Sequence, residues 1–490
     1  MGNHIGERAV VLGGSIAGML AAVPLSQAYR EVILIDRDDL TEPEPDRPAG
    51  VLTVRRAVPH GWQLQALLAK GQRVLEELFP GMTDELVSFG ASRGDFNKNV
   101  RWYFDGRKIK QVRSDMIAVG PGRPLLENRI RARISALPNV SFRQHTDILG
   151  IVATPDRKRI LGARIQSQQP GAEPETLLGD LVLDATGRGS RTPRWLTELG
   201  YPEVEEERVK MGLAYSTGNF LIDREDDLLG EDVASVPIGT PNLPRGAVYA
   251  RMAGYHSITL TGLLGQKPPT DRAGFLAYAE SLAIPDIAEV VRRAEFIHDP
   301  VPYNFPESRR RRFDKMASLP ENYLIMGDAA CIFNPIYAQG MTVAAVEATV
   351  LRDHLSHGKT PDPLKFQRDV VKRGTAIAWD VAGAGDFTHR GVTGNKGVKF
   401  AVGGWFVQKV TAAAEFDDKL STAFMRTAGL IAPPTSLMRP DLMARALFGK
   451  KSAPVPDPGY TPVRTAKVAD IADASDAARR TLRSDLRKAR

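Results

Sequence analysis

The sequence predicts an α/β fold in which a parallel-sheet domain carries an inserted antiparallel sheet and a C-terminal helical region. Residues 9–12 and 32–35 are short, β-branched apolar runs, and residues 19–29 between them have helical spacing. These three segments form a βαβ unit, which requires a parallel sheet with helices on its faces. From about residue 208 to 265 apolar and polar residues alternate, as in antiparallel strands. Residues 361–448 are mostly helical in pattern.

Helix breakers and apolar runs place the remaining elements. Residues 41–59 are rich in Pro and Arg and predict a long loop. The other expected elements are a helix at 63–79, a helix at 125–137, a buried strand at 181–183, a buried strand at 323–326 and a helix at 340–355.

Length and composition limit the classes of protein that are possible. A chain of 490 residues exceeds what one hydrophobic core usually supports, so two or three structural units are expected. No uncharged apolar run is long enough to span a membrane, and the N-terminus lacks the pattern of a signal peptide. Cys331 is the only cysteine, which excludes an internal disulfide and predicts a cytoplasmic location.

The net charge of +7 does not indicate nucleic-acid binding. Residues 449–490 contain ten basic and five acidic residues and therefore carry most of the excess. The rest of the chain is close to neutral and lacks the basic stripe of a nucleic-acid binder. Residues 450–490 are also poor in large apolar side chains, which predicts a disordered basic tail.

A glycine-rich turn follows the first predicted strand and opens the first helix. Such a turn lets the backbone approach a diphosphate, and the helix N-terminus then offers free N–H groups to it. An acid at the end of the second strand can accept hydrogen bonds from ribose hydroxyls. The residues concerned are Gly13, Gly14, Ser15, Ile16, Ala17, Gly18 and Asp36. They predict a Rossmann-like dinucleotide site, in which Ser15 replaces the usual middle glycine.

Two later segments predict further contacts with the same ligand. Residues 184–191 (DATGRGSR) follow a buried strand and contain Asp184 and Gly187. Residues 327–342 (GDAACIFNPIYAQGMT) follow another, and their acid, Asp328, can accept a ligand hydroxyl. The turn after Asp328 leads into a helix N-terminus, which would stabilise negative charge on a bound group. Gly327, Asp328, Pro335, Gly340 and Met341 are the expected contacts here.

These segments together resemble class A flavoprotein monooxygenases, which bind FAD in a domain of the glutathione-reductase type. The likeness is strongest to actinobacterial enzymes that epoxidise or hydroxylate polyketide and terpenoid chains, which are distant relatives of squalene epoxidase. It is carried by residues 67–81, 187–201, 309–313 and 327–348. The resemblance also implies that Arg123 contacts FAD. Gln63 and Gln65 stand where two histidines would be expected.

The resemblance implies a monooxygenase that takes electrons from NAD(P)H and passes one oxygen atom of O2, through a flavin C4a-hydroperoxide, to a hydrophobic natural-product-like substrate. Epoxidation would need a dry apolar pocket, whereas phenol hydroxylation would usually need a base. The sequence names no catalytic residue, and His256 is only a weak candidate for such a base. A metal site is not expected, because metal-binding motifs such as His-Glu-x-x-His are missing.

The same resemblance divides the chain into regions. Residues 1–205, with an excursion at 41–120, and residues 301–360 are expected to form the FAD-binding domain. Residues 206–300 are expected to form the substrate domain, followed by the helical region at 361–449.

Two alternative functions stay open. A reductase of the geranylgeranyl-reductase type would share the cofactor segments but saturate alkenes. A flavin-binding module without catalysis, docked through the basic tail, is the other alternative, although the complete loop at 335–342 speaks against it. Residues 309–312, a run of arginines, form either a site for NAD(P)H phosphates or a solvated surface.

Overall fold

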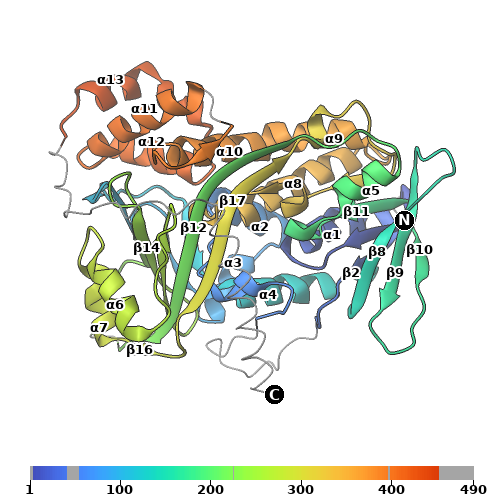
Figure 1. Ribbon diagram of the computed structural model, residues 1–490, viewed down its shortest axis with the longest axis horizontal. Coiled ribbons are helices and arrows are strands. Elements are labelled where there is room, and N and C mark those ends of the chain that lie inside the picture. The colour runs from blue at the N-terminus through green and yellow to red at the C-terminus, as the bar shows by residue number, and fades with distance from the viewer. Residues whose placement is uncertain (1–3, 41–53, 224–225, 396–397, 452–490) are drawn as a thin grey trace.

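The computed structural model describes residues 4–40, 54–223, 226–395 and 398–451 (Figure 1). Most of the predicted loop at 41–59 and nearly all of the predicted basic tail lie outside these ranges. Within them, no helix is both long and apolar enough to cross a membrane.

A parallel sheet in the order β18-β11-β1-β2-β7 forms the first layer. Alternate residues of its strands face opposite sides. Val11 and Leu34 pack on one side with helices α1 and α8, whereas Val10 and Ile33 pack on the other with α5 and a small antiparallel sheet. The strands are β1 (Gly6–Leu12), β2 (Tyr29–Ile35), β7 (Val140–Arg143), β11 (Leu181–Asp184) and β18 (Tyr323–Ile325), and the small sheet consists of β8 (Thr146–Ala153), β9 (Ile160–Ser167) and β10 (Glu175–Leu178).

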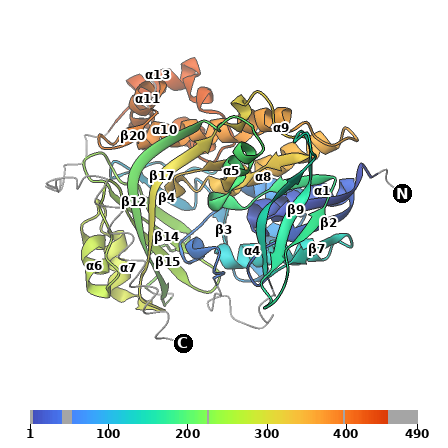
Figure 2. The same ribbon diagram turned by 45° about the vertical axis from the view of Figure 1, so that its right-hand side comes forward.

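The helices pack beside this layer or at its ends. Those nearest the parallel sheet are α1 (Ile16–Ala28), α2 (Ala69–Leu78), α3 (Met82–Ser88), α4 (Arg123–Ser135), α5 (Thr192–Glu198), α8 (Gly340–Leu355) and α9 (Pro363–Val370). Figure 2 shows the parallel sheet and the small sheet on one side of the molecule and the large sheet on the other. The βαβ unit and the helix at 125–137 are therefore confirmed, with α4 beginning two residues early.

A second, larger sheet is built around the long strand β12 and has the order β19-β17-β12-β15-β14-β13-β4-β5. Its strands are β4 (Val100–Phe104), β5 (Arg107–Lys108), β12 (Glu206–Leu221), β13 (Ala234–Pro237), β14 (Arg245–Arg251), β15 (His256–Gly262), β17 (Val301–Arg311) and β19 (Cys331–Ile332), with β16 (Glu295–Phe296) and β20 (Thr393–Gly394) paired to β12. A separate ladder joins β3 (Ser92–Asp95) to β6 (Ile117–Gly120).

The large sheet draws on more of the chain than the expected range 206–300. β17 pairs with β12 along most of its length, so residues 301–311 have their backbone partners in this sheet. β4 joins it through parallel pairing with β13. Helices α6 (Arg272–Glu280) and α7 (Asp286–Arg293) cover one of its faces around Phe220 and Ile258.

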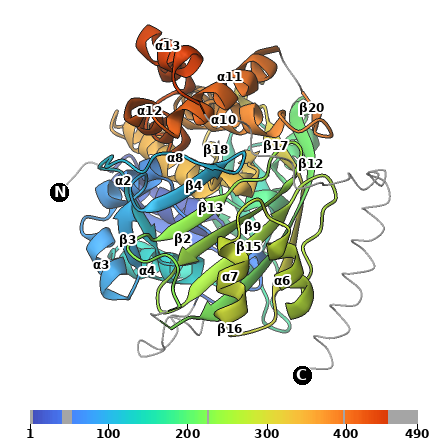
Figure 3. The same cartoon turned by 90° about the vertical axis from the view of Figure 1, so that its left-hand side faces the viewer.

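The C-terminal helices form a separate group above the edge of the large sheet (Figure 3). They are α10 (Ala376–Asp386), α11 (Val398–Ala414), α12 (Asp418–Ala428) and α13 (Pro440–Phe448). Their apolar side chains pack with Leu68, Phe96 and Met116, so this group closes over the region between the two main sheets.

The predicted helix at 63–79 is wrong in its first third. Helix α2 begins at Ala69, and the residues before it are held by distant partners instead of by a helical ladder. The Leu68 N–H donates to the Thr342 hydroxyl at 3.1 Å, and Gln63 bonds to Thr217 of β12. These tertiary contacts outweigh the local helical pattern.

Candidate functional site

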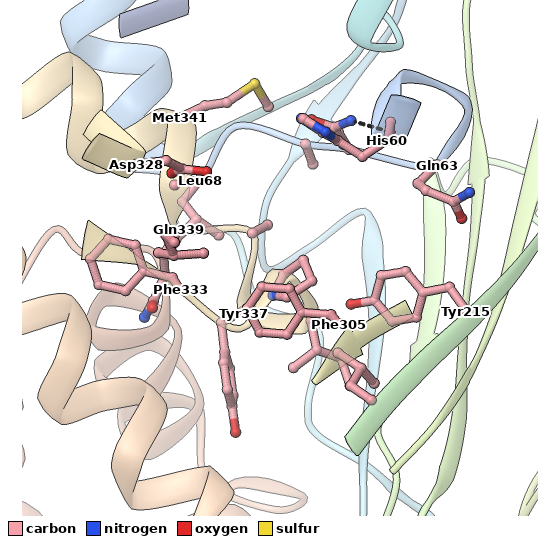
Figure 4. A pocket seen from close by; sticks show the side chains of 18 of the residues that line it. His60, Gln63, Leu68, Tyr215, Phe305, Asp328, Phe333, Tyr337, Gln339 and Met341 are labelled. Carbon is pink, nitrogen blue, oxygen red and sulfur yellow. Dashed lines mark hydrogen bonds between the residues drawn. The ribbon is translucent and has the colours of Figure 1, made fainter. Parts of the chain in front are cut away.

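A cavity of about 2150 Å³ is lined by the turns after β1, β11 and β18, by the large sheet and by helices α10 to α12 (Figure 4). The structure brings most of the predicted contacts together here. Gly13, Ser15, Ile16, Ala17, Asp36, Arg123, Gly187, Gly327, Asp328, Pro335, Gly340 and Met341 all line the cavity. Gly14, Gly18 and Asp184 lie behind the wall.

The turn after β1 is shaped by glycines that have no room for a side chain. Gly13 has φ of +108°, and a Cβ there would overlap the Ala185 carbonyl. A Cβ on Gly18 would overlap the Gly13 carbonyl, so α1 packs against the turn only with glycine at this position. The N-terminus of α1 therefore lies open to the cavity beside Ser15 and Ile16.

Asp36, at the end of β2, is fixed from two sides. Its Oδ2 accepts the Gly14 N–H at 2.8 Å, and its Oδ1 accepts the Asp38 N–H at 2.9 Å. Arg55 forms ion pairs with both carboxylates, at 3.4 Å to Asp36 and 3.2 Å to Asp38. Sequence reasoning missed Arg55, because its partners are distant in the chain and no local pattern marks it.

Arg123 opens α4 and spans the cavity wall next to this turn. Its guanidinium donates to the Ser15 hydroxyl at 2.9 Å and to the Gln65 carbonyl oxygen at 3.1 Å. It also pairs with the buried Glu127 at 2.8 Å. Burial alone would raise the pKa of Glu127, but Arg123 and Arg55 outweigh it and hold that pKa below its usual value. The Ser15 hydroxyl thus accepts a hydrogen bond from Arg123 and keeps its own proton to donate to a ligand.

His60 lies in the cavity wall among these cationic groups. Burial, reinforced by Arg123, lowers its pKa to about 3. The ring is therefore neutral at physiological pH, and the positive charge of this wall comes from arginine.

Asp328 faces the cavity from a turn that an unexpected residue supports. Gly327 has φ of +64°, and a Cβ there would lie 2.7 Å from the Ala17 side chain. The Gly327 N–H donates to Glu347 of α8 at 2.6 Å. Burial raises the pKa of Asp328 and raises that of Glu347 to about 8. One signal for Glu347 was available, since it is the charged residue within the mostly apolar run 343–351 of α8.

The loop of residues 333–342, here called the late loop, is held from α10. The Asn334 side chain accepts the Ile336 N–H at 3.1 Å and donates to Asp386 at 2.7 Å. The Tyr337 hydroxyl donates to the same Asp386 oxygen at 3.1 Å. Burial raises the pKa of Asp386 to about 7. These bonds fix the turn that delivers Gly340 and Met341 to the start of α8.

Three predictions about site residues need correction. Asp184 does not reach the cavity, because its oxygens accept the Thr186 N–H at 2.8 Å and the Ser190 hydroxyl at 2.6 Å and so shape the turn. His256 lies outside the cavity wall and contacts Asp227 at 3.2 Å. The arginines of 309–312 are not a freely solvated surface, since they are partly or fully buried and pair with acids of β12 and β17.

The residues present fit an FAD molecule. Gly13 and Gly327 leave no room for side chains at two turns that line the cavity, one after β1 and one directly before Asp328. Arg123 and the N-terminus of α1 suit a diphosphate, and the N-terminus of α8 suits the anionic edge of a flavin. Within the described parts of the chain, no cluster of three metal-ligating side chains occurs.

The fold is that of FAD-dependent monooxygenases such as PqsL, and the chain belongs to the same family as Protein Rv3254 of Mycobacterium tuberculosis. It is 30% identical over 441 residues to Protein Rv3254 of Mycobacterium tuberculosis, covering 87% of this chain and 90% of that protein. It is also 25% identical to Squalene epoxidase 1 of Arabidopsis thaliana, over 71% of this chain and 59% of that protein's length. No protein-family model matches the sequence.

Solved structures share the fold at low sequence identity. The flavin-dependent brominase Bmp2 superposes with a TM-score of 0.60 at 13% identity, covering 86% of this chain and 92% of Bmp2. PqsL of Pseudomonas aeruginosa gives 0.52 at 17% identity, over 86% of this chain and 99% of PqsL. The Diels-Alderase PyrE3 gives 0.56 at 14% identity, over 86% and 80% of the two chains. Because these neighbours differ in activity, the fold alone does not set the reaction.

Proposed function

We propose that the protein is an FAD-dependent monooxygenase that uses NAD(P)H and O2 to oxygenate a large, apolar, natural-product-like molecule. The observation that carries this proposal is the continuity of the cavity. It extends from the dinucleotide turn at Gly13, past Asp328 and the late loop, into a chamber beneath the C-terminal helices. Its volume of about 2150 Å³ is at least twice the roughly 1,000 Å³ upper range of common ligand pockets, which suits a cofactor together with a substrate.

The character of the chamber supports an apolar substrate. Its walls include aromatic and aliphatic side chains from both the sheet and the C-terminal helices, namely Trp102, Phe104, Val248, Met252, Phe406 and Phe424. A molecule with many polar groups would lose more hydration there than the mostly apolar walls could replace with hydrogen bonds. An apolar one would gain by leaving water.

In this proposal each residue that lines the cofactor part of the cavity, between Gly13 and the late loop, has a defined task. Asp36 accepts the ribose hydroxyls, Arg123 and the Ser15 hydroxyl contact the diphosphate, and Asp328 accepts a hydroxyl of the polyol chain. The backbone amides at the start of α8 stabilise negative charge on the ring system. When bound, FAD supplies the electron transfer and oxygen activation. The late loop and the apolar walls then exclude water from the reacting face.

Alkene epoxidation is favoured over phenol hydroxylation because the histidines of the cavity are only weak bases. His60 and His389 both line the cavity, and burial lowers their pKa values to about 3 and about 4. Histidines with such low pKa values are poor general bases at neutral pH. A reaction that requires no deprotonation of the substrate suits this environment better.

Isotope labelling tests the proposal. The purified holoenzyme is incubated with NADH or NADPH, ¹⁸O2 and a panel of terpenoid alkenes and polycyclic aromatics, and products are identified by mass spectrometry. Incorporation of one ¹⁸O atom per product is the expected result. A product that gains two hydrogens and no label, formed also without O2, would instead identify the reductase alternative.

A further inference from the structure

Three tyrosines meet where the late loop borders the apolar chamber, and they differ in their hydrogen bonds. The Tyr303 hydroxyl of β17 accepts from Arg188 at 3.3 Å, and the Tyr337 hydroxyl donates to Asp386 at 3.1 Å. The Tyr215 hydroxyl of β12 has no hydrogen-bond partner in any of the described ranges. Tyr215 is thus the member of this group whose hydroxyl makes no hydrogen bond to the described residues, whereas Tyr303 accepts one and Tyr337 donates one.

The position of Tyr215 places this hydroxyl at the reacting end of the cavity. Tyr215 lies directly opposite Tyr303 in the β12–β17 pairing, with ring centroids 6.3 Å apart. It belongs to the same hydrophobic cluster as Ile332 and Phe333, which lead into the late loop. Figure 4 shows its hydroxyl turned away from β12 and toward the cavity that it lines.

A hydroxyl in such a wall is costly unless something bonds to it. Tyr215 is 6% exposed as a whole residue, but protein does not cover its hydroxyl, which opens onto the cavity where a ligand can bond to it. Burial raises its pKa well above the ordinary value, so the phenol stays protonated and presents a donor. The complementary group on a ligand is therefore an acceptor oxygen.

Neighbouring polar side chains do not offer the same contact. Gln63 uses its carbonyl oxygen for Thr217 and its amide nitrogen for the Val301 carbonyl at 3.3 Å. Both amide atoms of Gln339 lack partners, but they are covered by protein and face no open space.

We propose that Tyr215 is a specificity-determining residue, whose hydroxyl donates a hydrogen bond to a carbonyl, ether or hydroxyl oxygen of the substrate. This inference rests on the proposed function, because it takes the chamber as the substrate site. It adds that the substrate is an oxygenated apolar molecule and not a pure hydrocarbon. The bond fixes the orientation of the substrate toward the late loop, which determines the carbon that is oxidised.

A matched pair of ligands tests this inference. The probes are 2-acetylnaphthalene and 2-ethylnaphthalene, which differ by a carbonyl oxygen, and their dissociation constants are measured by calorimetry on the holoenzyme. The wild-type protein is expected to bind the ketone about five- to tenfold more tightly, as one net hydrogen bond allows. Tyr215→Phe should abolish this preference while its affinity for the hydrocarbon stays within about twofold of wild type, as expected when a single hydrogen bond is removed.

Tyr303→Phe is the comparison variant, because the Tyr303 hydroxyl accepts from Arg188 but keeps a proton of its own to donate. It should keep the preference, and its loss in Tyr303→Phe alone would assign the bond to Tyr303 and overturn the inference. Equal affinity of the wild-type protein for the two probes, binding of neither, or an unchanged preference in Tyr215→Phe would overturn the inference. The comparison of the two probes on the wild-type protein does not depend on whether any variant folds. Binding is measured without NAD(P)H, so a failure here is distinct from a failure to transfer oxygen.

Discussion

Two acidic side chains, Asp36 and Asp328, carry the proposed cofactor site. Asp36 and Asp328 follow different strands of the parallel sheet, yet both face the same cavity. The Asp36 carboxylate is held by the Gly14 N–H, and the backbone before Asp328 is held by Glu347, which accepts the Gly327 N–H. Both acids were named from the sequence. Arg55 was not, because its partners are distant in the chain, and Glu347 was missed although its place in an apolar run could have marked it.

Replacing Asp328 with alanine should abolish retention of FAD, because the polyol chain loses its buried acceptor. Asp328→Asn keeps an acceptor oxygen and should retain FAD with reduced affinity. The measurement is the flavin content of the purified proteins, read from absorbance after release of the cofactor. An Asp328→Ala protein that is still saturated with flavin would remove Asp328 from the site.

Glu347 should make the protein less stable as the pH rises. Its pKa is about 8 in the folded chain, against 4.5 for an ordinary glutamate, so the folded form keeps a proton that the unfolded form releases between these values. The free energy of unfolding therefore falls from about pH 4.5 to about pH 8. Glu347→Gln still accepts from Gly327 but does not titrate, so its stability should decline less.

The measurement for Glu347 is the melting temperature of both proteins at pH 5 and pH 8 with saturating FAD. The drop in melting temperature should be smaller in Glu347→Gln by a few degrees. Asp386→Asn serves as a second case. Burial raises the pKa of Asp386 to about 7, so this residue too should make the protein less stable as the pH rises. Identical drops in wild type and Glu347→Gln would contradict the raised pKa.

Among the structural elements, those defined by local signals were predicted best. The β1–α1–β2 unit is determined by the spacing of its apolar residues, by its glycine turn and by the lengths of its segments. All three signals lie within residues 6–35. Residues 63–68, in contrast, are positioned by distant contacts. Their apolar spacing is helical, but Thr342 and Thr217 hold them extended along the cavity. Tertiary contacts of this kind leave no mark in the local pattern.

The close packing of α1 on the glycine turn gives a test at Gly18. Gly18→Ala would place a methyl group against the Gly13 carbonyl and force the helix away, at a cost of about 1–3 kcal/mol. Both the melting temperature and the FAD affinity should fall. Gly150→Ala is the matched control, because a Cβ there meets nothing within 4 Å. Equal behaviour of the two variants would show that the turn tolerates a side chain.

The assembly of the complete chain was only partly predictable. The sequence indicated both sheets and the helical C-terminal region, since each has its own periodicity. It did not indicate that β4 and β17 extend the large sheet, because pairing between strands so far apart in the chain has no local signature. The size of the cavity likewise depends on how the C-terminal helices pack over Leu68 and Phe96.

The measurement that tests oxygen transfer inside this cavity most directly is the coupling ratio, the amount of ¹⁸O-labelled product formed per NAD(P)H consumed. It is compared between wild type and Val248→Trp, whose larger side chain would fill part of the chamber. Leu221→Trp, on the exposed end of β12, is the control. Val248→Trp should keep FAD and still oxidise NAD(P)H, with a coupling ratio lower by tenfold or more, whereas Leu221→Trp should match wild type. An unchanged ratio in Val248→Trp, or the absence of labelled product from the wild-type protein, would contradict oxygen transfer in this chamber.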